Sequence, residues 1–245
     1  MRPRFHVPGV DATAARVELP EEEAEHLVRV LRLGIGDEVD VFDGRGGMWR
    51  AEIVEAGKRS AAVRTVQPLV PAPELEVSIT LVVSVLKGDK LDEVIRDAVM
   101  LGVASVRPII AERSEISAAA IARSHRIQRW QRIAVASAKQ CGRAVVPTVH
   151  DPTALPEYLS EPAATRVMCV EPSAAPTGVL SVLAVPRSAA VELMIGPEGG
   201  WSPLEVSAAS DSGAILMSLG GRTLRADAVP IVALTALLTT WGELK

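Results

Sequence analysis

Three glycines lie in a segment that could hold a small ligand. The run Ile195–Glu205 consists of the end of an apolar strand, a glycine-containing loop and the start of a helix. Gly196, Gly199 and Gly200 permit unusual backbone dihedral angles and leave room for a ligand close to the main chain. No Gly-Lys-Ser/Thr follows, so the segment is not a P-loop, and it lacks the G-x-G-x-x-G spacing of dinucleotide-binding proteins. A tight turn between strand and helix is the alternative interpretation of this loop taken alone.

Two further loops follow predicted strands. The loop Ser218–Asp227 places Arg222 and Arg225 beside two glycines at the entrance of the last helix, and the loop Val170–Ala174 follows an earlier strand. In α/β sheets, ligands bind outside the carboxyl ends of the strands. The three loops are therefore predicted to enclose one small molecule. Ordinary ion pairing with a neighbouring acid is the alternative for the two arginines.

The elements that must position these loops alternate between strands and helices. Ser78–Leu86 is nearly continuously apolar, as a strand buried on both faces should be. The helix Asp89–Leu101 and the strand Val103–Ile110 follow, and this strand–helix–strand unit predicts a parallel sheet. The remaining predicted strands are Val167–Val170, Val191–Ile195 and Ile215–Leu219. The remaining predicted helices are Arg123–Cys141, one that starts at a capping box of Ser202, Pro203 and Glu205, and one from Arg225 or Ala226 to Trp241. The last helix is expected to bury Ile231, Leu234, Leu237, Leu238 and Trp241.

The first 70 residues have a different pattern. Pro20 and three glutamates begin a helix that two glycines end. Short alternating runs separated by turn-rich segments then predict a small antiparallel sheet or barrel. These runs are Glu38–Phe42, Met48–Val54 and Ala61–Val66. Residues 71–76 include two prolines and predict a stiff linker, so we expect one domain at residues 1–70 and a second at 77–245.

The composition excludes several classes of function. The 245 residues have a net charge of −4 and only 3% are aromatic, so neither a uniformly basic coat nor an aromatic base-stacking platform is expected. Cys141 and Cys169 are too few for a disulfide framework or a zinc cage, and no metal is expected. The N-terminus lacks the apolar region of a signal peptide, and apolar stretches such as Val229–Leu238 are too short to span a membrane. We therefore expect a cytoplasmic protein that does not bind membranes.

Positive charge is concentrated in the middle of the chain. Between Arg113 and Arg143, seven basic side chains stand against one acid, Glu115. A solvated helix face and a surface that contacts RNA phosphates both explain this pattern. Composition alone does not separate the two interpretations.

The run IGPEGGWSPLE, followed about twenty residues later by LGGRTLRADA, resembles the bacterial RsmE family. The members of this family are 16S rRNA uridine-N3 methyltransferases of the knotted SPOUT class. The stretches VLKGDKLDEVIRDAVMLGVASVRPIIAERS and RWQRIAVASAKQCGRAVVP also match, and HLVRVLRLGIGDEVDVFDGRGG is similar to the family's small PUA-like domain. The resemblance extends over nearly the whole chain in the family's order.

The resemblance implies a fold and a set of ligands. The fold would be a SPOUT-type α/β methyltransferase domain with a parallel sheet and a C-terminal trefoil knot, preceded by a β-rich PUA-like barrel that binds RNA. The cofactor would be S-adenosylmethionine, bound by the three loops. The protein would act as a homodimer on 16S rRNA in the small ribosomal subunit. The cofactor-binding residues would be Val170, Glu171, Pro172, Ile195, Gly196, Pro197, Glu198, Gly199, Gly200, Ser218, Leu219, Gly220, Arg222 and Leu224.

The chemistry of uridine N3 suggests roles for the charged residues. N3 carries a proton, and its removal places negative charge on O2 and O4 of the base. An arginine beside these oxygens would favour the anion, and Arg225 or Arg222 is assigned this role. Asp227 and Glu198 are the candidate proton acceptors. The arginines expected to contact RNA phosphates are Arg29, Arg32, Arg123, Arg126, Arg129 and Arg132.

One motif departs from the family pattern. After the arginine the family usually has Glu, then Thr and Ala, whereas Arg225 is followed by Ala226, Asp227, Ala228 and Val229. The acid is one methylene shorter and the threonine is absent. Two other functions therefore stay open: a knotted methyltransferase that acts on tRNA or on a ribose hydroxyl, and a non-catalytic RNA-binding assembly factor.

Overall fold

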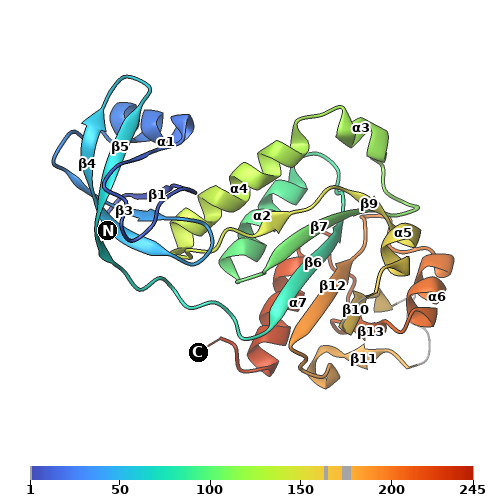
Figure 1. Ribbon diagram of the computed structural model, residues 1–245. Helices are drawn as coiled ribbons and strands as arrows, with labels where there is room; N and C mark the ends of the chain where they lie inside the picture. The colour runs from blue at the N-terminus through green and yellow to red at the C-terminus, as the bar shows by residue number, and fades with distance from the viewer. Residues whose placement is uncertain (1, 163–164, 173–177, 245) are drawn as a thin grey trace. The chain divides into compact units, whose positions relative to one another are not determined.

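The computed structural model describes residues 2–162, 165–172 and 178–244 (Figure 1). Packing divides it into two compact units. The first unit runs to Glu74 and also takes in Val135–Val146, and the second takes in Leu75–Ala134 and the chain from Pro147 onward. The division near residue 74 falls in the proline-containing segment, and the first unit adds a segment from the middle of the chain.

The first unit is built on a five-stranded sheet with the order β1-β3-β4-β5-β2. Its strands are β1 (Arg4–His6), β2 (Val17–Glu18), β3 (Glu38–Phe42), β4 (Met48–Ala56) and β5 (Ala61–Pro68). The pairs among β2 to β5 are antiparallel, as the alternating pattern predicts, and β1 pairs with β3 in parallel. Apolar residues of one face, among them Phe5, Val39 and Ile53, form the core.

The predicted N-terminal helix is shorter and less regular than expected. It consists of α1 (Glu21–Glu25) and a π-helical turn, His26–Val30. The N–H of Leu31 donates to the carbonyl of His26, five residues back. Arg32 then adopts a left-handed conformation with φ of 57°, which ends the helix before the glycines are reached.

The end of a long helix, α4 (Arg126–Cys141), belongs to the first unit because Arg4 binds it. The Arg4 guanidinium donates to four carbonyls at distances of 2.7 to 3.1 Å, and these are Ala138, Lys139, Gly142 and Arg143. A cation at this place satisfies carbonyls that the helix leaves without partners. Lys139 also forms an ion pair with Glu23 at 2.6 Å.

The second unit contains a parallel sheet with the order β11-β13-β10-β12-β6-β7-β8, and β9 pairs with β7. The strands are β6 (Ser78–Ser84), β7 (Ser105–Ile110), β8 (Thr148–Val149), β9 (Thr153–Ala154), β10 (Thr165–Cys169), β11 (Leu180–Ser181), β12 (Ala190–Ile195) and β13 (Ile215–Ser218). Every recorded pair in this sheet is parallel, which confirms the predicted α/β class. All carboxyl ends of these strands therefore lie at one edge.

Helices cover both faces of this sheet (Figure 1). They are α2 (Lys90–Met100), α3 (Ala118–Ala122), α4, α5 (Leu155–Ser160), α6 (Pro203–Asp211) and α7 (Val229–Thr240). α2 packs on α7, and α5 packs on α6. Val82, Met168 and Met194 of the strands share one core with residues of α5 and α6. Among the described residues, no helix is long and apolar enough to cross a membrane.

Two predicted helices start later than expected. The helix predicted from Arg123 starts at Arg126, because Arg123 ends the short helix α3. The last helix starts at Val229, because Arg225 to Ala228 form a turn in which the Ala228 N–H donates to the Arg225 carbonyl. In this helix Leu234, Leu237 and Leu238 are buried as expected, Trp241 is partly buried, and Ile231 is 41% exposed, so its predicted burial was wrong.

Candidate active site

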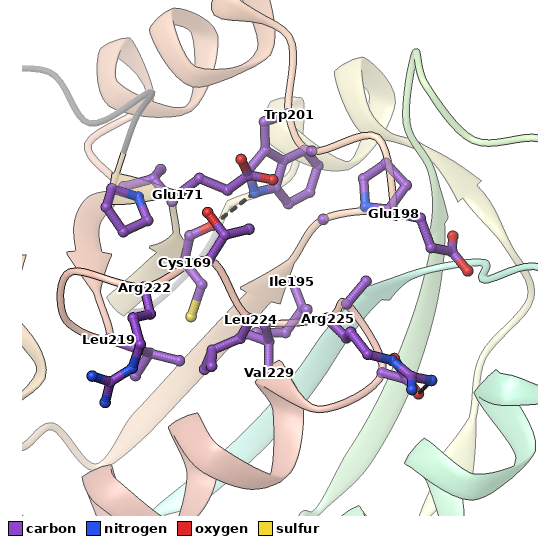
Figure 2. A pocket seen from close by; sticks show the side chains of 18 of the residues that line it. Cys169, Glu171, Ile195, Glu198, Trp201, Leu219, Arg222, Leu224, Arg225 and Val229 are labelled. Carbon is purple, nitrogen blue, oxygen red and sulfur yellow. Dashed lines mark hydrogen bonds and ion pairs between the residues drawn. The ribbon is translucent and has the colours of Figure 1, made fainter.

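A cavity of about 330 Å³ lies where the loops after β10, β12 and β13 meet (Figure 2). The structure brings most of the predicted ligand-binding residues to it: Val170, Glu171, Pro172, Ile195, Gly196, Pro197, Glu198, Gly200, Leu219, Arg222, Leu224, Arg225 and Asp227. Gly199, Ser218 and Gly220 are not part of the lining. Ser173 and Ala174, the end of the loop predicted after β10, lie outside the described residues. Trp201, Thr223 and Ala226, which lie within the predicted loop segments but were not named as ligand-binding residues, also line the cavity, and Lys90, Cys169 and Val229 line it from outside those segments.

The loop after β12 has the local geometry that its sequence predicts. The Ser202 hydroxyl accepts from the Glu205 N–H at 3.3 Å, and the Glu205 carboxylate accepts from the Ser202 N–H at 2.8 Å. This capping box fixes the start of α6. Gly200 has φ of +68°, a conformation that residues with a side chain rarely adopt. Gly200 is therefore required by the turn itself.

Neighbouring strand-exit loops hold this loop in place. The Arg113 guanidinium, from the loop after β7, donates to the Gly199 carbonyl at 2.9 Å. A Cβ on Gly199 would lie 3.1 Å from the Cβ of Arg113, so Gly199 faces this neighbour and not the cavity. The Glu112 N–H donates to the Glu205 carboxylate at 2.8 Å. No local sequence signal could have identified these contacts.

Trp201 closes the inner wall of the cavity. Its side chain is 7% exposed, and its Nε1–H donates to the carbonyl of Cys169 at 2.9 Å, which ties the loop after β12 to the end of β10 (Figure 2). A Cβ on Gly196 would lie only 3.0 Å from the Trp201 ring. Burial raises the pKa of the Cys169 thiol to about 12, so this cysteine is a neutral wall residue and not a nucleophile.

Two ion pairs form a charged end of the cavity. Lys90 Nζ lies 3.0 Å from Glu198 Oε1, and the Lys87 N–H donates to the same oxygen at 3.1 Å. Arg225 binds both carboxylate oxygens of Asp227, at 2.6 and 3.1 Å. Ion pairing with a neighbouring acid was the alternative interpretation for the two arginines, and the structure pairs Arg225 with Asp227.

The hydrogen-bond partners of Glu198 and Asp227 lower the pKa values of both carboxyl groups. Burial acts to raise the pKa of the Glu198 carboxyl, but hydrogen bonds from Lys90 and the main chain outweigh it and lower the pKa below its ordinary value. Burial likewise acts to raise the pKa of Asp227, and the hydrogen bonds from Arg225 outweigh it. Both carboxylates are ionised at neutral pH and can accept a proton.

The two candidate arginines lie at different parts of the cavity. Figure 2 shows Arg222 beside Leu219, whereas Arg225 lies on the side of Glu198, with Ile195, Leu224 and Val229 between them. The chain around Arg222 is exposed. Only Arg225 therefore belongs to the end of the cavity that carries Lys90, Glu198 and Asp227.

The arginines predicted to contact RNA have unequal surroundings. Arg129 forms ion pairs with Asp89 at 3.1 Å and with the buried Asp92, which also accepts from Trp130. Arg126 donates to the Gly88 carbonyl at 3.2 Å. Arg123 and Arg132 are exposed, Arg29 pairs with Glu25 at 3.3 Å, and Arg32 is exposed. Arg129 thus has a structural role that the sequence did not indicate.

The described residues contain no group of three or more His, Cys, Asp or Glu side chains that could hold a metal ion.

Comparisons with known proteins place the chain among RNA methyltransferases. A family model described as an RNA methyltransferase domain matches residues 73–238, and one described as an RNA methyltransferase PUA domain matches residues 19–66. The ribosomal RNA small subunit methyltransferase E of Synechocystis is 32% identical over 226 residues, which cover 91% of this chain and 73% of the relative. The protein of the same name from Bacillus subtilis is 26% identical and covers 88% of this chain and 87% of the relative.

Solved structures agree over the full length. The ribosomal RNA small subunit methyltransferase E of Neisseria gonorrhoeae, bound to S-adenosylmethionine, has a TM-score of 0.87 and 31% identity, and the match covers 98% of both chains. A putative methyltransferase from Legionella pneumophila, in complex with S-adenosylmethionine, has a TM-score of 0.89 and 27% identity over 98% of both chains. The predicted combination of a PUA-like domain and a parallel-sheet methyltransferase domain is thereby confirmed.

Proposed function

The chain belongs to the RsmE family of RNA methyltransferases, and from this premise we propose that it transfers the methyl group of S-adenosylmethionine to N3 of a uridine in the 16S rRNA of the small ribosomal subunit. The observation that carries the proposal is the cavity formed by the loops after β10, β12 and β13, at the edge where ligands bind parallel sheets. Two solved relatives with matching folds hold this cofactor.

The residues of the cavity fit S-adenosylmethionine. Its volume is in the range of small-molecule sites, which begins at about 300 Å³. Ile195, Leu224 and Val229 offer an apolar surface to a flat base, and Glu171 offers a carboxylate to a cationic group (Figure 2). When bound, the cofactor supplies a methyl group that its cationic sulfur already activates. The residues of the chain must therefore act mainly on the uridine.

Arg225 is the residue that we assign to the uracil anion. Its ion pair with Asp227 joins residues two apart in one turn, and the Arg225 side chain is 75% exposed whereas that of Asp227 is 16% exposed. Because the guanidinium is exposed to water, which screens the pair, Arg225 can leave Asp227 for a substrate at little cost. A guanidinium turned onto the uracil oxygens would stabilise the negative charge there and leave Asp227 free to accept the N3 proton.

Glu198 has a different assignment. Its carboxylate joins Lys90, at the start of α2, to the loop after β12, and it also accepts from a main-chain N–H. These residues are 108 positions apart in the chain, so the contact fixes one strand-exit loop against another. We therefore assign Glu198 and Lys90 to holding the cavity in shape, and Asp227 to the proton.

Exposed surfaces support the remaining parts of the proposal. Arg29, Arg32, Arg123 and Arg132 would contact rRNA phosphates.

An apolar strip on α7 is exposed to solvent: Ile231 is 41% exposed and Val232 is 40% exposed. A second copy of the chain would cover this strip in a homodimer. On the family resemblance we also propose that the C-terminal end is threaded as a trefoil knot. A ribosomal substrate places the reaction in the cytoplasm.

The test uses small ribosomal subunits that lack methylation. The protein is incubated with these subunits and with S-adenosylmethionine labelled in its methyl group, and the nucleosides are analysed by mass spectrometry. The proposal predicts labelled 3-methyluridine in 16S rRNA. Label on a ribose hydroxyl or in tRNA alone would replace it with the other knotted-methyltransferase function. Failure to bind the cofactor at all would favour a non-catalytic assembly factor.

A further inference from the structure

Among the residues that the structure describes, Glu171 differs from the two other acids of the cavity in having no hydrogen-bond or ion-pair partner. The carboxylates of Glu198 and Asp227 each form an ion pair with a basic side chain of the lining. Within the residues that the structure describes, the Glu171 carboxylate accepts no hydrogen bond and forms no ion pair. It is partly buried, so water reaches it less than it reaches a surface acid.

The position of the Glu171 side chain is set by the glycine loop. A Cβ on Gly200 would lie 2.8 Å from Glu171 Oε1, so the carboxylate rests directly on the main chain of the loop after β12. Figure 2 shows the side chain leaving the loop after β10 and extending toward Trp201. The charge therefore stands at the junction of two loops to which we assign the cofactor.

The Glu171 carboxylate has no counter-charge among the described side chains of the lining, so it is available to a positively charged group of a ligand in the cavity. The donor of the proposed reaction carries a positive charge on sulfur, and the product S-adenosylhomocysteine carries none there. The lining has three basic side chains, Lys90, Arg222 and Arg225, and three acids, so its charges balance.

We propose that Glu171 makes the cavity select the cationic donor over the neutral product, an assignment that rests on the proposed function. The carboxylate supplies the charge that opposes the sulfonium across a partly desolvated cavity. Transfer of the methyl group removes the ligand's charge and with it this attraction. Glu171 is thus a specificity-determining residue that favours exchange of product for fresh donor.

Calorimetric titration of three ligands tests this role without measuring activity. The ligands are S-adenosylmethionine, S-adenosylhomocysteine and sinefungin, in which a protonated amine replaces the methylsulfonium. Glu171→Gln keeps the shape of the side chain and removes its charge. Glu157→Gln, an exposed glutamate of α5 outside the cavity, is the matched control.

We expect Glu171→Gln to lose affinity for the cationic ligands and to keep its affinity for the neutral product. Glu171→Gln should weaken binding of the two cationic ligands about tenfold and change binding of S-adenosylhomocysteine by less than about twofold. Retained binding of S-adenosylhomocysteine also shows that the variant is folded. The control should match the unaltered protein for all three ligands.

Two results would overturn the assignment while leaving the proposed function intact. Equal weakening of all three ligands would mean that Glu171 contacts the ribose or amino-acid part that they share. Unchanged binding of all three would mean that its charge does not act on the ligand. If the unaltered protein bound none of them, the proposed function would fail and this inference would fail with it.

Discussion

Replacement of Arg225 by alanine should stop methyl transfer without preventing cofactor binding. The Arg225 side chain lines the cavity, is 75% exposed and has Asp227 as its ion-pair partner two residues away. It is therefore free to act on a substrate and contributes little to the fold. The substitution removes the guanidinium that we assign to the developing uracil anion and leaves the loops in place.

The size of the effect follows from the exposure of the side chain. A preorganised donor aimed at developing charge is worth about 10²- to 10³-fold in kcat, or about 2.7–4 kcal/mol. Since Arg225 is exposed before substrate binds, we expect the lower end, about 10²-fold. An exposed ion pair contributes about 0–1 kcal/mol to stability, so Tm should fall by less than about 4 °C.

The assay is single-turnover methyl transfer to unmethylated small subunits, with calorimetry of S-adenosylmethionine beside it. Arg96→Ala is the control, because Arg96 is an exposed arginine of α2 outside the cavity. Arg225→Ala should bind the cofactor within about twofold of the unaltered protein and lose the rate. An unchanged rate in Arg225→Ala would refute the role of this arginine. Loss of cofactor affinity with an unchanged single-turnover rate would place it in the cofactor site instead.

Two other substitutions test the contacts that hold the cavity in shape, and a third change tests the arginines that we assign to RNA binding. Trp201→Phe leaves a buried carbonyl of β10 without its donor and should lower the free energy of unfolding by about 1–3 kcal/mol in urea titrations; unchanged stability would contradict that hydrogen bond. In the native protein the pKa of Glu198 is depressed below 4.5, so its contribution to stability is present above that pH and is lost as pH falls through the lowered pKa. Lys90→Met removes the cation and leaves burial to raise the pKa, so acid unfolding followed by circular dichroism down to about pH 3 should begin at higher pH; an unshifted acid transition would contradict the pairing. Charge reversal of Arg123 and Arg132 to Glu should weaken binding to rRNA and make the dependence of log K on log salt shallower, whereas an unchanged slope would return these residues to the solvated-face interpretation.

The sequence predicts the layered fold because its signals are local. Ser78–Leu86 is apolar throughout, and β6 at Ser78–Ser84 is paired on both sides, with β7 and β12. Ser202 and Glu205 specify the start of α6 from within four residues. The two-residue strands β2, β8, β9 and β11 carry too little pattern to be recognised. The insertion of β12 between β10 and β6 depends on contacts distant in the chain, which no local pattern records.

Some parts of the candidate site could likewise be predicted from the sequence, and others could not. Glycines identified two of the three loops, those after β12 and β13, and the loop after β10 was identified only by its place after a predicted strand. The pairing of Lys90 with Glu198 spans 108 positions, so no local pattern could single out Lys90. Ile231 is apolar and at helical spacing, yet it is exposed, since α7 turns only part of its apolar surface inward. Periodicity detects an apolar face but not whether another element covers it.

The proposed function depends most directly on where S-adenosylmethionine binds. A crystal structure of the protein grown with the cofactor measures this. We predict electron density for the cofactor against Gly196, Gly200 and Leu224, with Glu171 facing its positively charged part. Density for the cofactor elsewhere, with these loops in contact with one another, would contradict the central claim.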